Sequence, residues 1–180
     1  MRASMLALAL LLVAADSAAT RAIDPAKSKV LFSVSHVFVE HVTGTVPIVS
    51  GTVAYAGGST VPTSVTAVLD PKKIKTGEDD RDGVLQTSDW FDTAKYPTWT
   101  FSSEKISSSG TAGDFTMDGR LTIHGVSQPE HLTVTTAGTP EHPLYHATGQ
   151  IDRHAFGISV TRLDPAIGNP VDVTLDIALK

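Results

Sequence analysis

The stretch DFTMDGRLTIH, residues Asp114–His124, alternates between two kinds of residue along its whole length. Its odd-numbered positions hold apolar residues or glycine, and its even-numbered positions hold polar residues. Because successive side chains of a strand point to opposite faces of a sheet, this pattern predicts a long strand with one apolar face. The same alternation recurs in Val171–Leu179 and in Val30–Val34. Weaker versions occur at Val53 and Tyr55, Val65 and Leu69, Leu132 and Val134, and Tyr145, Ala147 and Ile151.

Clusters of turn-forming residues separate these predicted strands, at Ala56–Gly58, Ser107–Gly110 and Gly138–Pro140. They allow most neighbouring strands to pair antiparallel, which is typical of a sandwich or a barrel. About eight strands with one apolar face each can close into a barrel, and closure removes the exposed edges of an open sheet. The predicted fold is all-β, an eight-stranded antiparallel barrel with one short helix. Small inward residues such as Gly119 and Gly149 either leave room for a ligand or accommodate bulky neighbours.

The predicted helix follows a polar segment in the middle of the chain. Thr76 is followed at the third position by Asp79, which resembles a capping box, and the neighbouring acidic residues suit the positive end of a helix. The helix is expected to run to about Gln86. Because Gly83 weakens it by about 1 kcal/mol relative to alanine, it depends on the packing of apolar residues such as Leu85.

The segment DGVLQTSDWFDTAKYPTWTFSS, Asp82–Ser103, holds both tryptophans. Trp90 and Phe91 lie in a polar turn between two aspartates, so they are expected to pack against other parts of the protein. After a proline, Trp99 and Phe101 alternate with threonine and serine in the pattern of a strand with one apolar face. The four rings are expected to converge on one interior.

The N-terminus resembles a secretory signal peptide. Arg2 precedes an apolar run, Met5–Val13, and small residues at Ser17–Ala19 suit cleavage. Residues 1–19 are therefore predicted to be a signal peptide and residues 20–180 a single domain. The apolar run is short for a membrane span and no second run approaches the roughly 20 residues that a span needs, so no stable membrane insertion is expected. The predicted location is the periplasm.

Charge and composition exclude several functions. The net charge of −5 does not favour nucleic acid or anionic lipid surfaces, so no nucleic-acid partner is expected. The chain has no cysteine, which excludes disulfides, thiolate catalysis and cysteine metal sites. There is no Gly-x-Ser-x-Gly turn and no glycine-rich phosphate loop, so nothing in the sequence argues for an enzyme.

The histidines and the acidic residues do not predict a metal site. His36 and His41 are five residues apart, which is neither a helical nor a strand ligand spacing. The acidic run Glu78–Asp82 lacks the alternating spacing of calcium ligands. His36 continues the inward parity of the strand that holds Phe32, and it is read either as a hydrogen-bonded structural residue or as a contact to a ligand head group.

Two arginines stand directly beside an aspartate near the predicted ends of elements. They are Arg81 next to Asp82 and Arg153 next to Asp152. The adjacent carboxylate is expected to pair with each arginine, because an unpaired buried charge is costly. The pairs are read as architectural, with a contact to a ligand head group as the alternative.

Four blocks of the chain, in order, resemble the YceI-like family of periplasmic, lipocalin-like proteins. The blocks are His36–Gly44; Arg81-Asp82, Leu85, Ser88–Asp92, Lys95–Pro97 and Phe101–Ser103; Gly119–Val126 with Pro129; and Asp152-Arg153 with Phe156-Gly157. The resemblance implies an elongated eight-stranded barrel whose apolar tunnel binds a polyisoprenoid, an isoprenoid quinone or a fatty amide, without catalysis. No cofactor and no metal are expected. The chain departs from the family pattern at Phe38, Val46, Pro47 and Val84. These departures suggest a different ligand preference, and Pro47 interrupts a strand.

The leading hypothesis is a carrier or storage protein for a long-chain isoprenoid or other lipid. The residues predicted to bind the ligand are Phe32, Val34, His36, Leu85, Trp90, Phe91, Trp99, Phe101, Phe115, Met117, Leu121 and Ile123. The alternative is a small-molecule hydrolase or isomerase that uses His36 with a carboxylate at the tunnel mouth. An outer-membrane barrel is a third hypothesis, and it requires the polar faces inside. The sequence is also compatible with a homodimer.

Overall fold

The computed structural model describes residues 19–37, 40–57, 59–110, 113–159, 162 and 164–180. The predicted signal peptide, apart from Ala19, and Phe38 lie outside these residues. Within the described ranges the chain forms ten strands, one α-helix and three short 3₁₀ helices: β1 Ala19–Ala22, β2 Lys29–His36, β3 Glu40–Thr45, β4 Ile48–Tyr55, β5 Pro62–Leu69, η1 Pro71–Lys73, α1 Asp79–Leu85, β6 Trp99–Ser108, β7 Phe115–Ile123, β8 Val126–Gly138, β9 Pro143–Asp152, η2 Arg153–Phe156, η3 Asp164–Ala166 and β10 Ile167–Ala178.

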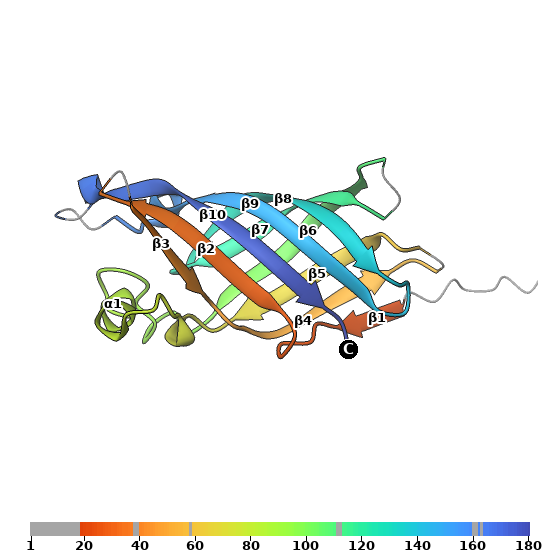
Figure 1. Ribbon diagram of the computed structural model, residues 1–180, viewed down its shortest axis with the longest axis horizontal. Helices are drawn as coiled ribbons and strands as arrows, with labels where there is room; N and C mark the ends of the chain where they lie inside the picture. Colours follow the sequence, from red (N-terminus) through yellow and green to blue (C-terminus); the bar gives the residue numbers. More distant parts are fainter. Residues whose placement is uncertain (1–18, 38–39, 58, 111–112, 160–161, 163) are drawn as a thin grey trace, which may run out of the picture.

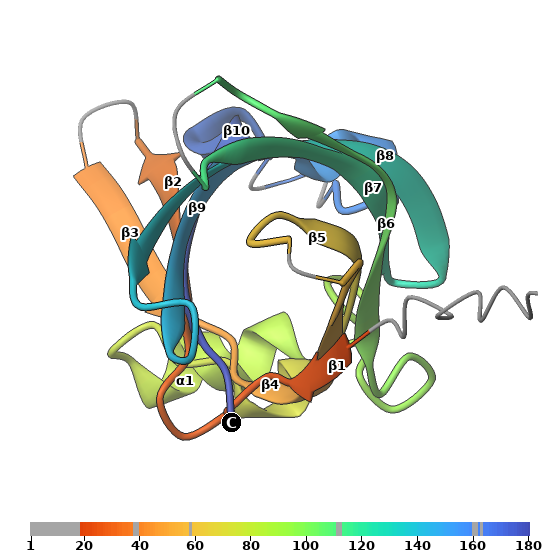
Figure 2. The ribbon, with the colours of Figure 1, turned by 90° about the vertical axis from the view of Figure 1, so that its right-hand side faces the viewer.

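The strands form one antiparallel sheet in the order β1-β4-β5-β6-β7-β8-β9-β10-β2-β3. The sheet curls so that its strands form a ring when viewed along the long axis (Figure 2). β3 pairs with β2 and β4 pairs with β5, while only Val46 and Pro47 separate β3 from β4 along the chain. The continuous backbone of β3 and β4 therefore joins the two sides of the curled sheet into a barrel.

The barrel class is as predicted, but the predicted number of strands is wrong. The sheet has ten strands where eight were expected. β3 ends and β4 begins on either side of Val46 and Pro47, in agreement with the prediction that Pro47 interrupts a strand, because proline has no N–H to continue the ladder. The short strand β1 is an additional strand, and the backbone N–H of Lys180 donates to the carbonyl of Ala22 over 2.9 Å where β1 meets the C-terminal end of β10.

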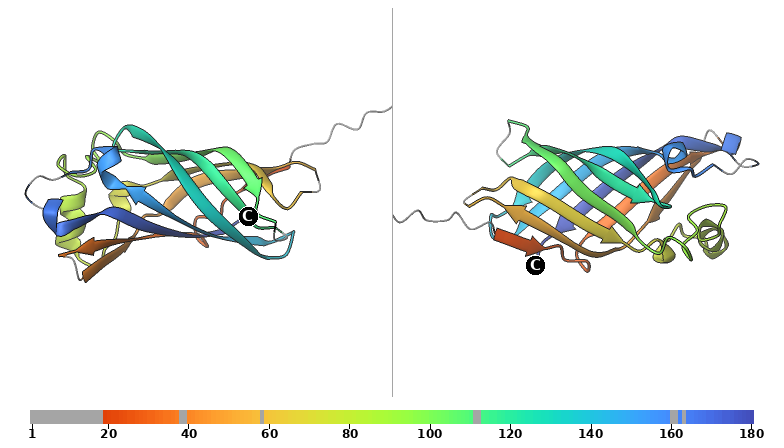
Figure 3. Two further views of the ribbon diagram at one scale, coloured as in Figure 1. Left: turned by 90° about the horizontal axis from the view of Figure 1, so that it is seen from above. Right: turned by 180° about the vertical axis from the view of Figure 1, so that it is seen from behind.

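The helix α1 is shorter than predicted and begins differently. It lies at one end of the barrel, and β1 lies at the other (Figures 1 and 3). Glu78 is the N-cap residue, without a side-chain capping bond, so the predicted pairing of Thr76 with Asp79 is wrong. Instead, the backbone N–H and the hydroxyl of Thr76 donate to Oδ1 of Asp82 over 2.8 Å and 2.7 Å. Both bonds hold the pKa of Asp82 below its ordinary value, and the bond from the hydroxyl has the larger effect.

The apolar faces of the strands point into the barrel, as the alternation predicts. Phe115, Met117 and Ile123 of β7 are buried, while Asp118 and Arg120 between them are exposed. This arrangement is the reverse of the one that the outer-membrane hypothesis requires, since the polar faces lie outside. The barrel interior is therefore the hydrophobic core of the protein.

Candidate functional site

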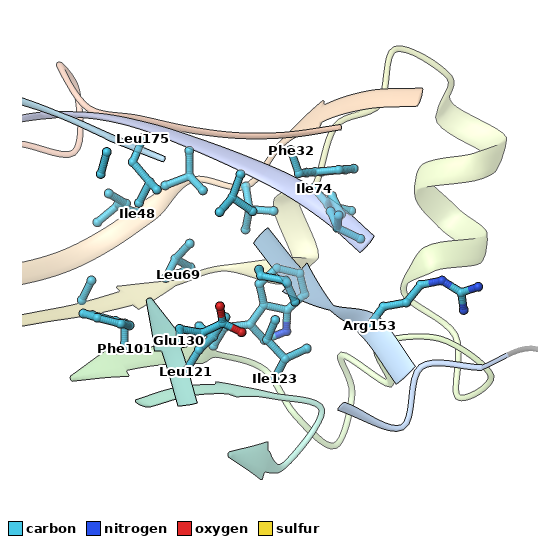
Figure 4. Close-up of a pocket in the computed structure, with 18 of the residues that line it drawn as sticks. Phe32, Ile48, Leu69, Ile74, Phe101, Leu121, Ile123, Glu130, Arg153 and Leu175 are labelled. Atoms are coloured by element: carbon cyan, nitrogen blue, oxygen red, sulfur yellow. The ribbon is translucent and has the colours of Figure 1, made fainter. Parts of the chain in front are cut away.

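The barrel encloses an elongated apolar cavity of about 560 Å³. Side chains from most strands and from the α1 end contribute to its wall, and Figure 4 shows part of this lining. The volume lies in the range of small-molecule binding sites, and the lining is predominantly hydrophobic and aromatic, as in such sites. A filled core would not leave this space, because protein interiors are ordinarily close-packed.

Every residue predicted to bind the ligand lines this cavity. Phe32, Val34 and His36 come from β2, Leu85 from α1, Trp90 and Phe91 from the segment after α1, Trp99 and Phe101 from β6, and Phe115, Met117, Leu121 and Ile123 from β7. The pleat of each strand explains this result, since inward positions of one strand share one face. That these side chains contact a ligand stays a prediction.

The aromatic rings of the central segment converge, as expected. Phe91 and Trp99 pack edge to face, with ring centroids 4.7 Å apart and an interplanar angle of 70°. Trp90 and Trp99 are both buried. The indole Nε1–H of Trp99 has no hydrogen-bond acceptor among the described residues, although it is buried. It is one of few polar groups in an apolar wall.

Of the two alternatives for the small residues, the structure supports the accommodation of bulky neighbours at Gly119 and Gly149. The Phe101 ring lies over Gly119, where a Cβ would stand 2.5 Å from Cζ of that ring. In the same way, a Cβ at Gly149 would stand 2.7 Å from Cδ2 of Leu132. The space beside these two glycines is therefore occupied by the neighbouring side chains.

Two buried tyrosines lie near the far end of the cavity, and Tyr145 lines it. The hydroxyls of Tyr55, at the end of β4, and Tyr145, on β9, are hydrogen-bonded to each other. Burial raises the pKa of both phenols above the ordinary value. Tyr145 also packs edge to face on Phe115, with centroids 5.8 Å apart. These contacts place a neutral polar pair at the end of the cavity remote from α1.

His36 lies at the other end of the cavity, where it is half-buried at the end of β2. Its register partners are Ile167 and Glu40. Among the described residues, no carboxylate is hydrogen-bonded or ion-paired to its imidazole. The hydrolase or isomerase alternative requires such a partner.

The prediction that each arginine pairs with the adjacent aspartate is wrong. Arg81 bonds to Thr76 and lies 3.1 Å from Glu78, whereas Asp82 faces Lys75 at 3.3 Å. Neighbouring side chains of a helix point in different directions, so the adjacent residue is not the partner. Arg81 also lines the cavity near its α1 end.

Arg153 is buried and fully bonded inside the protein. Its guanidinium donates to the carbonyls of Ile158, Ile167 and Gly168 over 2.7–2.9 Å and to Oδ1 of Asp164 over 2.6 Å. Arg153 holds the pKa of Asp164 below its ordinary value. Asp152 instead accepts from the backbone N–H of Ala155 over 3.2 Å and caps η2. The architectural reading of Arg153 fits these contacts, with a different partner.

Sequence reasoning missed Glu78 and Asp80 at the α1 end of the cavity and two further groups of lining residues. The first of these groups is apolar and comes from predicted strand faces that were not assigned to the site, including Val30, Leu175 and Ile177. The second is the carboxylate of Glu130 on β8, which lines the cavity and is half-buried. Burial, and secondarily the charge of Asp152, raises the pKa of Glu130 to about 7. Its inward parity with Leu132 was the signal that could have identified it.

No helix in the described ranges is long and apolar enough to cross a membrane. Within the same ranges, no three histidine, aspartate or glutamate side chains come together as ligands for a metal ion.

Comparison with known proteins gives consistent relatives. A family model described as the YceI-like domain matches residues 22–179. Protein YceI of Escherichia coli O6:H1 is 30% identical over 152 residues, covering 81% of this chain and 78% of that protein. A UPF0312 protein of Shewanella denitrificans is 29% identical over 186 aligned residues, covering 99% and 95%.

Solved structures share the fold. BcnA of Burkholderia cenocepacia superposes with a TM-score of 0.78 at 22% identity, covering 88% of this chain and 99% of that one. A polyisoprenoid binding domain from Saccharophagus degradans, implicated in plant cell wall breakdown, gives a TM-score of 0.66 at 18% identity, covering 91% and 99%. The barrel described above is thus an established architecture.

Proposed function

The chain belongs to the YceI-like family, and from that premise we propose that it binds, transports or stores a long amphiphilic lipid in the barrel cavity without transforming it. The observation that carries the proposal is the apolar cavity of about 560 Å³ that runs inside the barrel. The proposed ligand is a polyisoprenoid, an isoprenoid quinone or a fatty amide. The polyisoprenoid class is tested first, because the fold neighbour from Saccharophagus degradans is a polyisoprenoid binding domain.

Burial of the apolar chain is sufficient to drive such binding. Each buried methylene contributes about 0.8 kcal/mol, so a sixteen-carbon chain offers about 12 kcal/mol before the costs of association. Those costs are about 4–15 kcal/mol and include the ordering of a flexible chain. Strong binding therefore needs a well-shaped apolar cavity and no catalytic group.

Mass spectrometry of an organic extract tests the proposal directly. Protein expressed with its own N-terminus and purified without detergent is expected to contain co-purified lipid, and lipid-stripped protein is expected to take up an added polyprenol. Both tryptophans line the cavity, so quenching or enhancement of their fluorescence reports uptake. Protein that is lipid-free and also refuses polyprenol, quinone and fatty amide would contradict the proposal.

A pair of variants on β5 tests whether the ligand lies inside the barrel. Ala67 is half-buried and lines the cavity, whereas Ser64 of the same strand is exposed. Ala67→Phe fills the cavity and is expected to weaken lipid uptake at least tenfold, while Ser64→Phe adds the same ring outside and is expected to leave uptake unchanged. Equal uptake by both variants would place the lipid elsewhere.

We also propose that the protein acts in the periplasm after removal of residues 1–19. The support is the sequence pattern of the N-terminus, which lies almost wholly outside the described residues. N-terminal sequencing of protein from a periplasmic fraction is expected to begin at Thr20. Recovery of the uncut chain from the cytoplasm would contradict this assignment.

A further inference from the structure

The barrel wall opens between β8 and β9. β8 pairs with β7 from Val126 to Val134, but its ladder with β9 covers only Thr133–Gly138. Among the described residues, none of β9 pairs with β8 before Thr133, although the carbonyl oxygen of His131 and the side chain of Leu132 still lie against Gly149. The first half of β8 contains Pro129, which cannot donate a ladder hydrogen bond. A cleft occupies the opening, and η2 lies beside it, held by a 2.7 Å hydrogen bond from Nε2 of Gln128 to the carbonyl of Ala155.

Glu130 stands at the boundary between this cleft and the main cavity. It lines both spaces. Its backbone is opposite Gly119 of β7, the glycine that the ring of Phe101 covers. Figure 4 shows the carboxylate among the side chains of the cavity, in the group that includes Phe101 and Leu121. A carboxylate thus projects into an apolar wall at a lateral opening.

No cation among the described residues bonds to this carboxylate. His131, next to it on β8, is exposed and lies 2.6 Å from Asp118 on the outer face. Arg153 forms an ion pair with Asp164 and hydrogen bonds to backbone carbonyls, and its guanidinium points away from Glu130 in Figure 4.

A second carboxylate lies near Glu130 and carries the same negative charge. It is Asp152, at the end of β9, which also lines the cleft. Gly119 and Phe101, on the β7 and β6 side, carry no charge. The opening is therefore acidic, and its half-buried carboxylate has neither a cationic partner nor full hydration. Both circumstances raise the free energy of its charged form.

We propose that Glu130 is a head-group site for an amphiphile whose polar end carries an ammonium group. The proposal rests on the lipid-binding function above: the apolar chain lies in the barrel, and the ammonium reaches the carboxylate at the β8–β9 opening. A ligand ammonium supplies the missing opposite charge in a partly desolvated place, where a charge-assisted hydrogen bond is strong. An anionic head group is repelled there by Glu130 and Asp152.

Proton linkage follows from the same geometry. The pKa of Glu130 is raised to about 7 in the free protein, so part of the population is protonated at neutral pH. An ammonium at hydrogen-bond distance favours the charged carboxylate and lowers that pKa. Binding of the amine therefore releases protons near pH 7, and its affinity increases between pH 6 and pH 8. A neutral head group has no such dependence.

The test compares ligands of one chain length in the intact mature protein. Dodecylamine, dodecanol and dodecanoate are titrated below their micelle concentrations against tryptophan fluorescence at pH 7.5. The wild-type protein is expected to bind the amine about tenfold more tightly than the alcohol and the alcohol more tightly than the carboxylate. In Glu130→Gln the ratio of the amine affinity to the alcohol affinity is expected to fall to about twofold or less.

Glu104→Gln is the matched control, because Glu104 is an exposed carboxylate on β6 that pairs with Arg120 outside the barrel. This variant is expected to retain the amine preference. A preference that survives in Glu130→Gln would place the ammonium at other acidic groups, such as Asp80 near α1, and would overturn the inference.

The alcohol separates the two proposals. Alcohol binding without an amine preference overturns only the head-group site, whereas a wild-type protein that binds neither amine nor alcohol overturns the lipid-binding function as well. Thermal unfolding of each variant, followed by circular dichroism, checks that a lost preference is not a lost fold.

Discussion

The ring of Phe101 on β6 lies directly against the backbone of Gly119 on β7, so that a Cβ at position 119 would stand 2.5 Å from the ring and 2.7 Å from the carbonyl oxygen of Ser102. The side chain of Phe101 lines the cavity, and Gly119 provides the space that the ring occupies. This contact sets the orientation of one wall residue through a residue that has no side chain.

Gly119→Ala is expected to destabilise the protein by about 1–3 kcal/mol, because the added methyl group overpacks a position bounded by backbone. Gly83→Ala in α1 is the control, since a Cβ there meets nothing within 4 Å. It is expected to stabilise the protein by about 0.5–1 kcal/mol. Urea denaturation measures both changes. Equal effects of the two substitutions would contradict the packing described here.

Arg153→Lys is expected to cost about 2–4 kcal/mol of unfolding free energy. Lysine cannot replace the planar fork that binds Asp164 and three carbonyls at once, and it leaves buried acceptors unpaired. Arg120→Lys changes an exposed pair with Glu104 and is expected to stay within about 0.5 kcal/mol of the wild type. A small effect at Arg153 in urea denaturation would argue against its architectural role.

The buried tyrosines predict a loss of stability at alkaline pH. The pKa of Tyr145 is raised by burial, so its contribution is fully present below the ordinary value near pH 10 and is lost as the pH rises beyond it. Tyr145→Phe removes the ionisable group. Relative to wild type, its unfolding free energy is expected to rise between pH 9 and pH 11, which denaturation at several pH values measures. A constant difference would mean that the phenol is hydrated in the folded state.

Glu130 predicts a second pH dependence, in the neutral range. Its folded pKa of about 7 lies above the ordinary value of 4.5, so its contribution is present below pH 4.5 and is lost as the pH rises through 7. In ligand-free protein, Glu130→Gln is therefore expected to gain about 1–2 kcal/mol relative to wild type between pH 5 and pH 8. This gain is smaller than the difference between the two pKa values alone implies, because water screens the charge of a half-buried side chain. Unchanged relative stability would show that the carboxylate is fully solvated.

Much of the site could be predicted because it depends on strand parity. Alternation in Val30–Val34 and in Asp114–His124 identified side chains that all line the cavity, and the aromatic segment placed Trp90 and Trp99 in the same interior. Parity is a property of a single strand and needs no knowledge of its neighbours. The same rule applied to β8 would have included Glu130, but its polar side chain did not match an apolar template.

The amino-acid sequence by itself determined which face of each strand is apolar and hence that the interior is a hydrophobic space, because the pleat converts a period of two into two faces. Only the tertiary structure decided which residues meet across that space. Phe101 covers Gly119 because of the register of β6 on β7, and Arg153 pairs with Asp164 rather than with Asp152 because η2 turns its side chain toward η3. Glu130 faces an opening because β8 pairs with β9 only from Thr133 onward. Such contacts depend on register and on the ends of ladders, which join residues distant in the chain and leave no local pattern in it.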